Sequence, residues 1–179
     1  MLTNATIPIL GFVAPSGTGK TTLLKAIISL LKSEGIRLAV IKHSHHDFEI
    51  DKPGKDSYEL RMSGADQMLI ASKHRWALIT ENSSIRDEPK LNTLLQRLDQ
   101  QNLDLVLVEG FKFEKFPKIE LFRSGHSRSP LTKSDADIIA IATDTSCNID
   151  DNIPRLDLNS AEEIFQFIIQ HFQLAKNIN

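Results

Sequence analysis

The sequence contains one cysteine, Cys147, among its 179 residues. A single cysteine excludes a disulfide within the chain, which suits a reducing, cytoplasmic location. The sequence also lacks an excess of charge of either sign, because 21 lysines and arginines are balanced by 23 aspartates and glutamates. A net charge of −2 gives no overall attraction to nucleic acid or to an anionic membrane, so we expect neither as a partner.

Long hydrophobic runs and flexible linkers are absent as well. The first apolar run, IPILGFVA at residues 7–14, has no basic segment before it and is too short to span a membrane as a helix, so we expect a buried strand. No stretch rich in proline, glycine or serine is long enough to divide the chain, and no repeat occurs. The length and an ordinary globular composition predict a single domain with a substantial core.

Predicted strands and helices alternate along the chain. Strands are expected at residues 7–14, 37–43, 66–72, 75–80, 103–110, 118–122, 137–143 and 155–158, and helices at residues 21–35, 56–65, 87–101 and 160–172. The nearly continuous apolar run at 103–110 is typical of a central strand covered on both faces. This order predicts a three-layer α/β fold, with a mainly parallel central sheet and helices on both faces.

Short polar signals predict where some of these helices begin. Ser160 with Glu163, and Asp56 with Glu59, have the spacing of a capping box, in which the first side chain accepts from a backbone amide of the first turn. Asp87 is the expected N-cap of the helix at 87–101.

One motif predicts a phosphate-binding loop. Residues 14–21, Ala-Pro-Ser-Gly-Thr-Gly-Lys-Thr, fit the pattern G-x-x-x-x-G-K-[ST], with alanine in the first glycine position. Glycines in such a loop let successive N–H groups point at phosphate oxygens, and the following helix adds the positive end of its dipole. The predicted phosphate ligands are Ser16, Gly17, Thr18, Gly19, Lys20, Thr21 and Thr22. The loop predicts a P-loop NTPase fold, with one nucleotide-binding domain over residues 1–179.

Lys20 can reach the β and γ phosphates, and Thr21 offers a hydroxyl to Mg²⁺. Acidic partners must come from the carboxyl ends of strands beside the loop. Glu109 ends the run LDLVLVE, and Asp47 follows the strand RLAVIKH. Thr21, Glu109 and Asp47 are therefore the candidate Mg²⁺ ligands, and Lys20, Asp47 and Glu109 are the candidate catalytic residues. Asp104 starts its strand and is expected to be structural.

The polar segment after residue 43 allows more than one interpretation. It holds three histidines, His43, His45 and His46. On an extended chain His43 and His45 share a face with Asp47, which is compatible with a transition-metal site, but contacts to phosphate are favoured. Lys55 and Arg61, near a Pro-Gly turn, form either a solvated loop or a second site for an anion.

Two acids are candidates for recognising guanine. The segment LTKSD at 131–135 matches [NT]-K-x-D, whose acid accepts from the N1 and N2 hydrogens of guanine. That motif is expected directly after an apolar strand, whereas here the apolar strand follows it. Asp144 does stand at the end of an apolar strand, DIIAIATD. Asp135 and Asp144 therefore remain alternatives, and the residues leave the choice between guanine and adenine open.

Two apolar features are also ambiguous. Phe111, Phe113 and Phe116 either pack on the sheet or form a contact surface. The strands at 66–72 and 75–80 offer an edge for pairing with another subunit.

Several motifs together resemble one family. GTGKTTLLK, IKHSHHDFEIDKPGKDSYELR, RWALITE, LDLVLVEGFK and KIELFR are similar to the molybdopterin-guanine dinucleotide biosynthesis adaptor family, MobB, over about residues 7–170. The phosphate loop alone would not identify a family, whereas the histidine-rich block combined with LVEGFK is specific. The segment SRSPLTKSDAD matches no motif of this resemblance.

The resemblance implies a homodimer that binds GTP and Mg²⁺ in the cytoplasm and hydrolyses GTP weakly at most. It implies partnership with the molybdopterin guanylyltransferase MobA, which attaches GMP to molybdopterin to give the guanine dinucleotide cofactor. By this resemblance residues 17–22 hold phosphates, Thr21 and Glu109 serve Mg²⁺, and Lys55 and Arg61 approach the phosphate of molybdopterin. A P-loop small-molecule kinase or ligase and a nickel-delivery GTPase are the alternatives. No glutamine or arginine is evident in the sequence for rapid hydrolysis.

Overall fold

The first apolar run forms β1 (Ile9–Val13), in which every residue is buried. The structure is a computed structural model that describes residues 2–44, 47–82, 88–124, 130–145 and 152–174. The chain divides into two compact units, one formed by Met1–His43 with Lys90–Asn179 and the other by Ser44–Pro89. The single domain over residues 1–179 stays a prediction.

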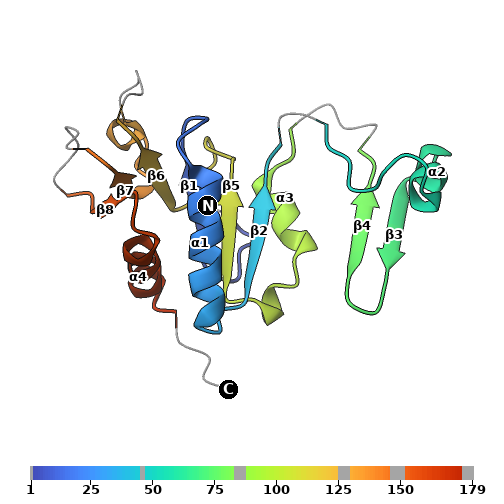
Figure 1. Ribbon diagram of the computed structural model, residues 1–179, viewed down its shortest axis with the longest axis horizontal. Coiled ribbons are helices and arrows are strands. Elements are labelled where there is room, and N and C mark those ends of the chain that lie inside the picture. The colour runs from blue at the N-terminus through green and yellow to red at the C-terminus, as the bar shows by residue number, and fades with distance from the viewer. Residues whose placement is uncertain (1, 45–46, 83–87, 125–129, 146–151, 175–179) are drawn as a thin grey trace. The chain divides into compact units, whose positions relative to one another are not determined.

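The first unit contains a six-stranded sheet. Its strands besides β1 are β2 (Leu38–Lys42), β5 (Leu105–Glu109), β6 (Lys118–Phe122), β7 (Ile138–Thr143) and β8 (Arg155–Asp157). The order is β2-β5-β1-β6-β7-β8, and every neighbouring pair is parallel (Figure 1). Because the strands are parallel, their carboxyl ends all lie at the same edge of the sheet, which is where α/β proteins bind ligands.

Helices cover both faces of this sheet. α1 (Lys20–Ser33) and α4 (Ala161–Phe172) pack on one face. α3 (Leu91–Leu94) and the 3₁₀ turns η1 (Leu95–Arg97) and η2 (Gln100–Asn102) belong to the other, where Leu91 and Leu95 pack with β1 and β5 residues (Figure 1). The predicted three-layer α/β fold is thereby confirmed. The predicted cap is also present, since the hydroxyl of Ser160 accepts from the Glu163 backbone amide at 3.2 Å.

The helix predicted at 87–101 is wrong in extent. Only Leu91–Leu94 is α-helical, and 3₁₀ turns follow. Side-chain hydrogen bonds interrupt the segment, because the Gln100 amide donates to the backbone carbonyls of Asn4 and Leu95. The predicted N-cap, Asp87, lies outside the described residues. The first amide of the helix, at Leu91, instead donates to the carboxylate of Glu114 at 2.8 Å.

The connection from β6 to β7 buries two charged side chains. Lys118 is 1% exposed, and its Nζ atom lies 3.1 Å from Asp135 and 3.6 Å from Asp137. Glu120 is fully buried, and its carboxylate accepts from the backbone amides of Leu131 and Thr132. Both donors belong to the 3₁₀ turn η3 (Leu131–Lys133). Both charges are therefore satisfied by the crossover segment, as buried ionised groups require.

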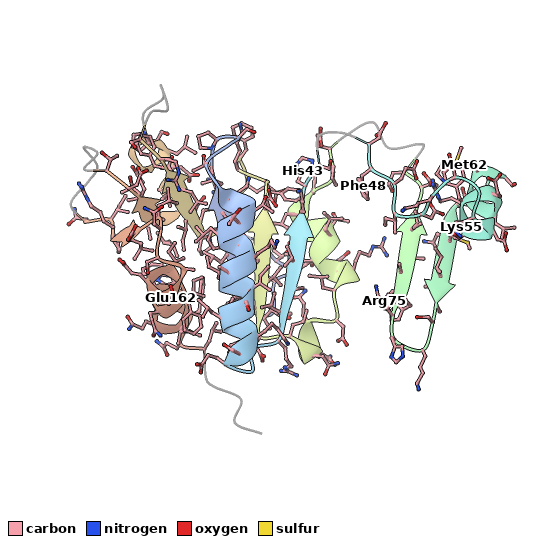
Figure 2. The ribbon with its side chains drawn as sticks, in the orientation of Figure 1. His43, Phe48, Lys55, Met62, Arg75 and Glu162 are labelled. Atoms are coloured by element: carbon pink, nitrogen blue, oxygen red, sulfur yellow. The ribbon has the colours of Figure 1, made fainter. Side chains whose placement is uncertain are left out.

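The second unit contains α2 (Asp56–Met62) and an antiparallel hairpin of β3 (Gln67–Ala71) and β4 (Trp76–Thr80), which confirms the two close strands. One face of the hairpin is exposed in both strands. It carries the cross-strand pairs Leu69 with Leu78 and Ala71 with Trp76. Figure 2 shows Arg75 in the turn of this hairpin. Among the described residues, no helix combines the length and the apolar character needed to cross a bilayer.

The capping box predicted for α2 is wrong. Lys55, not Asp56, occupies the N-cap position, and it makes no side-chain cap hydrogen bond. The carboxylate of Glu59 instead accepts from the backbone amide of Gly54 at 3.3 Å. The helix therefore begins one residue earlier than a cap at Asp56 would allow.

Candidate phosphate-binding site

The predicted phosphate loop lies between β1 and α1, as its chemistry requires. Gly17 and Gly19 have φ angles of 81° and 91°, which a residue with a Cβ atom adopts only at a cost. Thr18 is buried, and its hydroxyl donates to the carbonyl of Pro15 at 2.8 Å, which closes the loop on itself. Lys20 is the first residue of α1, so the positive end of the helix dipole lies at the loop.

The loop encloses a depression of about 370 Å³. Its lining consists of Pro15, Ser16, Gly17, Thr18, Gly19, Lys20, Thr21, Thr22 and Glu109. Every phosphate ligand predicted from the sequence motif is on this lining, and Glu109 of β5 is brought to it although it is distant in the sequence. Backbone amides, a helix N-terminus and a lysine form a site whose chemistry favours an anion such as a phosphate chain.

Glu109 connects the loop to two lysines. Its carboxylate oxygens lie 3.2 Å from Nζ of Lys20 and 3.7 Å from Nζ of Lys42. Lys42 is the residue paired with Glu109 in the β2–β5 register, so the parallel pairing fixes this contact. The three side chains carry a net charge of +1, which favours an anion at the rim of the depression.

The turn after Glu109 fixes the end of β5. Gly110 has a φ angle of 101°, and a Cβ atom there would lie 2.7 Å from the Cβ atom of His43. The ring of His43 stacks on Phe111 with centroids 4.7 Å apart, and the His43 amide donates to the Glu109 carbonyl at 2.8 Å. His43 therefore packs against the turn that orients Glu109. Phe111 and Phe116 pack in the core, whereas Phe113 is exposed.

The residues at the loop are suitable for a magnesium ion bound together with a phosphate chain. Thr21 in the first turn of α1 has a hydroxyl and Glu109 a carboxylate, and Mg²⁺ prefers oxygen ligands of these kinds. Within the described residues, no group of three or more histidine, cysteine or acidic side chains could hold a metal by itself.

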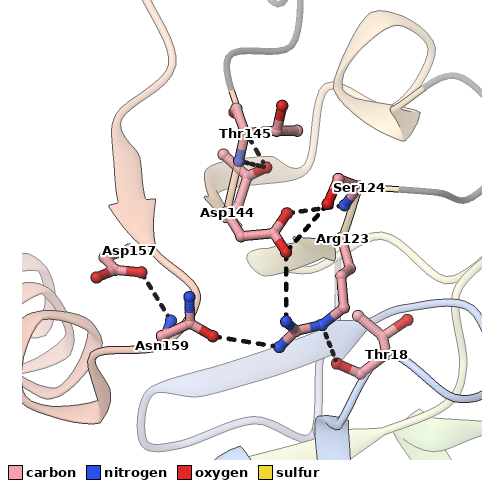
Figure 3. Close-up of polar contacts among 8 residues, drawn as sticks. Thr18, Arg123, Ser124, Asp144, Thr145, Asp157 and Asn159 are labelled. Carbon is pink, nitrogen blue, oxygen red and sulfur yellow. Dashed lines mark hydrogen bonds and ion pairs between the residues drawn. The ribbon is translucent and has the colours of Figure 1, made fainter.

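Arg123 is a site residue that the sequence analysis missed. It follows β6 at the same edge of the sheet, and its Nε atom donates to the carbonyl of Thr18 at 3.3 Å (Figure 3). Its Nη1 and Nη2 atoms donate to Asp144 at 3.3 Å and to Asn159 at 3.4 Å. The positions of these residues in the sequence could have indicated a site. Each of them, Arg123, Asp144 and Asn159, comes within two residues of the carboxyl end of a predicted strand.

The two candidate guanine-binding acids lie in different places. Asp135 precedes β7 and pairs with the buried Lys118 in the crossover. Asp144 follows β7, and the backbone N–H of Ser124 donates to its carboxylate at 2.7 Å. This bond, followed by the hydroxyl of Ser124 and the charge of Arg123, lowers the pKa of Asp144 below its ordinary value. Of these two acids, Asp144 is therefore the one connected to the phosphate loop, through Arg123, and base recognition by either residue stays a prediction.

The remaining predicted site residues belong to the second unit. Asp47 is exposed there, and its role as a metal ligand stays a prediction. Two of the histidines, His45 and His46, lie outside the described residues. Lys55 is exposed at the N-terminal end of α2 (Figure 2).

Arg61 lies in an acidic environment, which is not the one expected of a residue that binds an anion. It is 9% exposed, and its guanidinium pairs with the carboxylates of Glu81, Asp51 and Glu49. The hydrogen bonds that Arg61 donates to Glu81 and then to Asp51 raise its pKa above the ordinary value. Three carboxylates around one guanidinium leave the cluster negative, which disfavours a phosphate at this residue.

The comparisons with known proteins agree with the site. The family model for molybdopterin guanine dinucleotide synthesis protein B matches residues 9–144. The chain is 49% identical over 168 residues to the molybdopterin-guanine dinucleotide biosynthesis adapter protein of Escherichia coli K12, covering 93% of this chain and 94% of that protein. It is 42% identical over 176 residues to the adapter protein of the same name from Haemophilus influenzae, covering 97% and 96%.

The fold is shared with a solved structure. The crystal structure of a molybdopterin-guanine biosynthesis protein B, 26% identical, matches with a TM-score of 0.71 over 92% of this chain and 99% of that one. The resemblance found in the sequence motifs is thereby confirmed. The chain belongs to the MobB family of molybdopterin guanine dinucleotide synthesis proteins.

Proposed function

We propose that the protein is a GTP-binding adaptor that assists the formation of molybdopterin guanine dinucleotide. The observation that carries this proposal is the phosphate loop with Lys20 and Glu109 at its rim, in a chain of this family. The relatives that are named adapter proteins of this pathway support it. The alternatives of a small-molecule kinase or a nickel-delivery GTPase are not favoured by these relatives.

In this proposal the phosphates of GTP bind to the backbone amides of residues 16–22 and to Lys20. Mg²⁺ is held by Thr21 and Glu109 and, when bound, neutralises phosphate charge. Lys42 adds a second positive charge beside Glu109. Asp47 is a further Mg²⁺ ligand proposed from the sequence alone.

Hydrolysis is proposed to be slow. Fast P-loop enzymes place an arginine or a water-orienting glutamine at the γ-phosphate. In the described part of the chain, the lining of the depression contains neither residue type. Rapid hydrolysis would then require a partner protein to supply such a group. Otherwise the GTP-bound protein is itself the functional state.

The partners proposed are the guanylyltransferase MobA, molybdopterin or its guanine dinucleotide, and a second copy of this chain, all in the cytoplasm. Of the two basic residues predicted for this site, Lys55 is the one proposed to contact an anionic pterin, since Arg61 is already surrounded by carboxylates. The exposed apolar face of the β3–β4 hairpin supports the homodimer, because an exposed apolar patch of this kind often marks a surface that contacts another protein.

The proposal is tested by measuring GTP binding with and without MobA and molybdopterin, using calorimetry. An adaptor requires that each partner change the affinity for GTP, and that GTP change the affinity for the partner by the same factor. Lys20→Ala is the control for the loop, and it should weaken GTP binding by at least about tenfold without altering the melting temperature by more than a few degrees. Independent binding of the three ligands would show that the protein does not couple them.

A further inference from the structure

The guanidinium of Arg123 connects its own segment, at the end of β6, with three other segments that are distant in the sequence. It contacts the phosphate loop at the carbonyl of Thr18, the end of β7 at Asp144 and the segment after β8 at Asn159 (Figure 3). Each of its three nitrogen atoms donates to a different acceptor. A planar guanidinium can do this because its donors point in fixed, divergent directions, whereas the single ammonium of a lysine cannot.

The two other contacts of the guanidinium are themselves held in place. Asp144 is fixed by the backbone amide of Ser124 at 2.7 Å. The backbone amide of Asn159 donates to Asp157 at 2.8 Å, at the end of β8 (Figure 3). Strand ends of the central sheet therefore determine where the guanidinium lies, and Arg123 transmits that position to the loop.

The contact with the Thr18 carbonyl also orients the Gly19 N–H. The Thr18 carbonyl and the Gly19 N–H belong to one peptide bond, and none of the peptide bonds among the described residues is cis. In a trans peptide the N–H points away from the carbonyl. A donor that fixes the carbonyl on one side of the loop therefore fixes the Gly19 N–H on the opposite side, and Gly19 lines the depression.

Gly19 needs such a restraint because a glycine has little conformational preference of its own. Its φ angle of 91° is one of many that glycine adopts freely, so local preference alone does not hold this peptide. An atom added at its Cβ position would lie 3.9 Å from Nη2 of Arg123, so the guanidinium lies against this part of the loop. The equivalent position at Gly17 has no atom within 4 Å.

We propose that Arg123 is a positioning residue for phosphate binding, which orients the Thr18–Gly19 peptide so that the Gly19 N–H donates to a phosphate oxygen. The inference rests on the proposed function, in that the loop must bind the phosphate chain of a nucleoside triphosphate. Hydrogen bonding at the carbonyl also polarises the peptide, which strengthens its N–H as a donor. Arg123 acts from behind the loop and does not touch the phosphate.

The test compares Arg123→Ala and Arg123→Lys with the wild-type protein. Affinities for GTP and for inorganic tripolyphosphate are measured by calorimetry, and the ¹H–¹⁵N resonance of Gly19 is followed by NMR. Arg123→Ala should weaken both ligands alike, by about five- to tenfold, as expected for one hydrogen bond. The Gly19 resonance should shift in both variants, because lysine keeps the charge but not the fixed, divergent donors of a guanidinium.

Arg155→Ala is the matched control, since Arg155 is an exposed arginine at the first residue of β8. It should leave both affinities and the Gly19 resonance unchanged. Millimolar guanidinium ions should partly restore tripolyphosphate binding to Arg123→Ala but have no such effect on Arg155→Ala. A loss of stability alone would not produce this rescue.

The outcomes separate the two proposals. If the wild-type protein binds neither GTP nor tripolyphosphate, the proposed function is wrong and the role of Arg123 fails with it. If the wild-type protein binds both and Arg123→Ala binds them equally well, only the role of Arg123 is wrong. If Arg123→Ala does not fold, Arg123→Lys decides, and an unshifted Gly19 resonance with unchanged affinities would overturn the inference.

Discussion

The Nζ atom of Lys20 lies 3.2 Å from a carboxylate oxygen of Glu109, which joins the first residue of α1 to the last residue of β5. Lys42 lies 3.7 Å from the other oxygen. A phosphate chain would compete with Glu109 for Lys20, and its own charge would be repelled by the carboxylate. Glu109 should therefore oppose binding of free GTP and favour binding of its magnesium complex.

Replacing Glu109 by glutamine should have opposite effects on the affinity for GTP in the absence and in the presence of magnesium. Without Mg²⁺, Glu109→Gln should bind GTP about fivefold more tightly than the wild-type protein, because a repulsion of roughly 1 kcal/mol between charges about 4 Å apart in a water-like medium is removed. With Mg²⁺ present, the same variant should bind GTP more weakly than the wild-type protein. Calorimetric titrations in EDTA and in Mg²⁺ measure both effects.

Lys20→Ala is the comparison for this prediction, because it removes a phosphate ligand instead of a metal ligand. It should weaken GTP binding by at least about tenfold, with or without Mg²⁺, as expected for a charge-assisted hydrogen bond. If Glu109→Gln weakened binding equally in both buffers, Glu109 would be a structural support of Lys20 and not a metal ligand.

The hairpin of the second unit leads to a prediction about assembly. Leu69 and Leu78 face each other across the strands and are 60% and 44% exposed, and Trp76 on the same face is 69% exposed. If a second copy covers this face, Leu69→Glu should weaken the dimer by about a hundredfold or more, because burying a leucine is worth roughly 1.5–3 kcal/mol and the new charge must also be desolvated. Sedimentation equilibrium measures the change.

Thr80→Glu is the matched control for the hairpin, since it adds a charge to the same exposed face without removing apolar surface. It should leave most of the dimer intact. A wild-type protein that is monomeric at micromolar concentration would rule out the homodimer, and a dimer that Leu69→Glu leaves intact would place the interface elsewhere.

The sequence predicted most of the fold because the strands of a parallel sheet are continuous apolar runs and the phosphate loop has a fixed glycine spacing. It also placed Asp104 correctly as structural, since the Arg37 guanidinium binds its carboxylate at 2.8 Å. That contact raises the pKa of Arg37 above its ordinary value. These features depend on residues near one another in the chain or on a motif with a single mechanism.

The sequence did not predict features that depend on the order of strands. Arg123 reaches Thr18 only because β6 lies beside β1, and no local pattern contains that adjacency. The pairing of Arg61 with Glu81 likewise joins α2 to the end of β4. The shortened α3 has the same origin, because the amide of Gln100 finds partners in the distant N-terminal segment.

The segment LTKSD leads to a prediction about base preference and stability. Asp135 is engaged by Lys118 at the amino end of β7, whereas the phosphate loop follows the carboxyl end of β1. Changing both Asp135 and Asp137 to asparagine should therefore leave the preference for GTP over XTP unchanged. It should lower the free energy of unfolding by about 3–5 kcal/mol, because the buried ammonium of Lys118 loses both partners.

Lys118→Met should cost less than the double aspartate change. Methionine keeps most of the volume, and the two carboxylates left behind are 23% and 35% exposed, so water can solvate them. Urea unfolding of the two variants provides the comparison. A GTP preference lost in the double variant would restore Asp135 as the guanine-binding acid, and a larger cost for Lys118→Met would contradict the account of the buried charge.

Asp144 should contribute to stability in a pH-dependent way. The backbone amide of Ser124, and then its hydroxyl and Arg123, hold the pKa of Asp144 below its ordinary value of 3.8 in the folded protein. The unfolded state therefore binds a proton more readily, so the stabilisation is fully present above about pH 4 and is lost as the pH falls through the lower, folded value. The difference in unfolding free energy between the wild-type protein and Asp144→Asn should be largest near pH 6–7 and should shrink below about pH 4.

Ser124→Ala separates this effect from general acid sensitivity. The variant keeps the backbone N–H, which is the main cause of the lowered pKa, and removes only the hydroxyl contact at 3.3 Å. It should retain most of the pH-dependent difference from Asp144→Asn, because the amide and Arg123 still stabilise the ionised carboxylate. Urea unfolding curves at intervals from pH 3 to 7 measure the three proteins. If the unfolding free energies of the wild-type protein and Asp144→Asn differed by the same amount at every pH, Asp144 would contribute through packing and not through its charge.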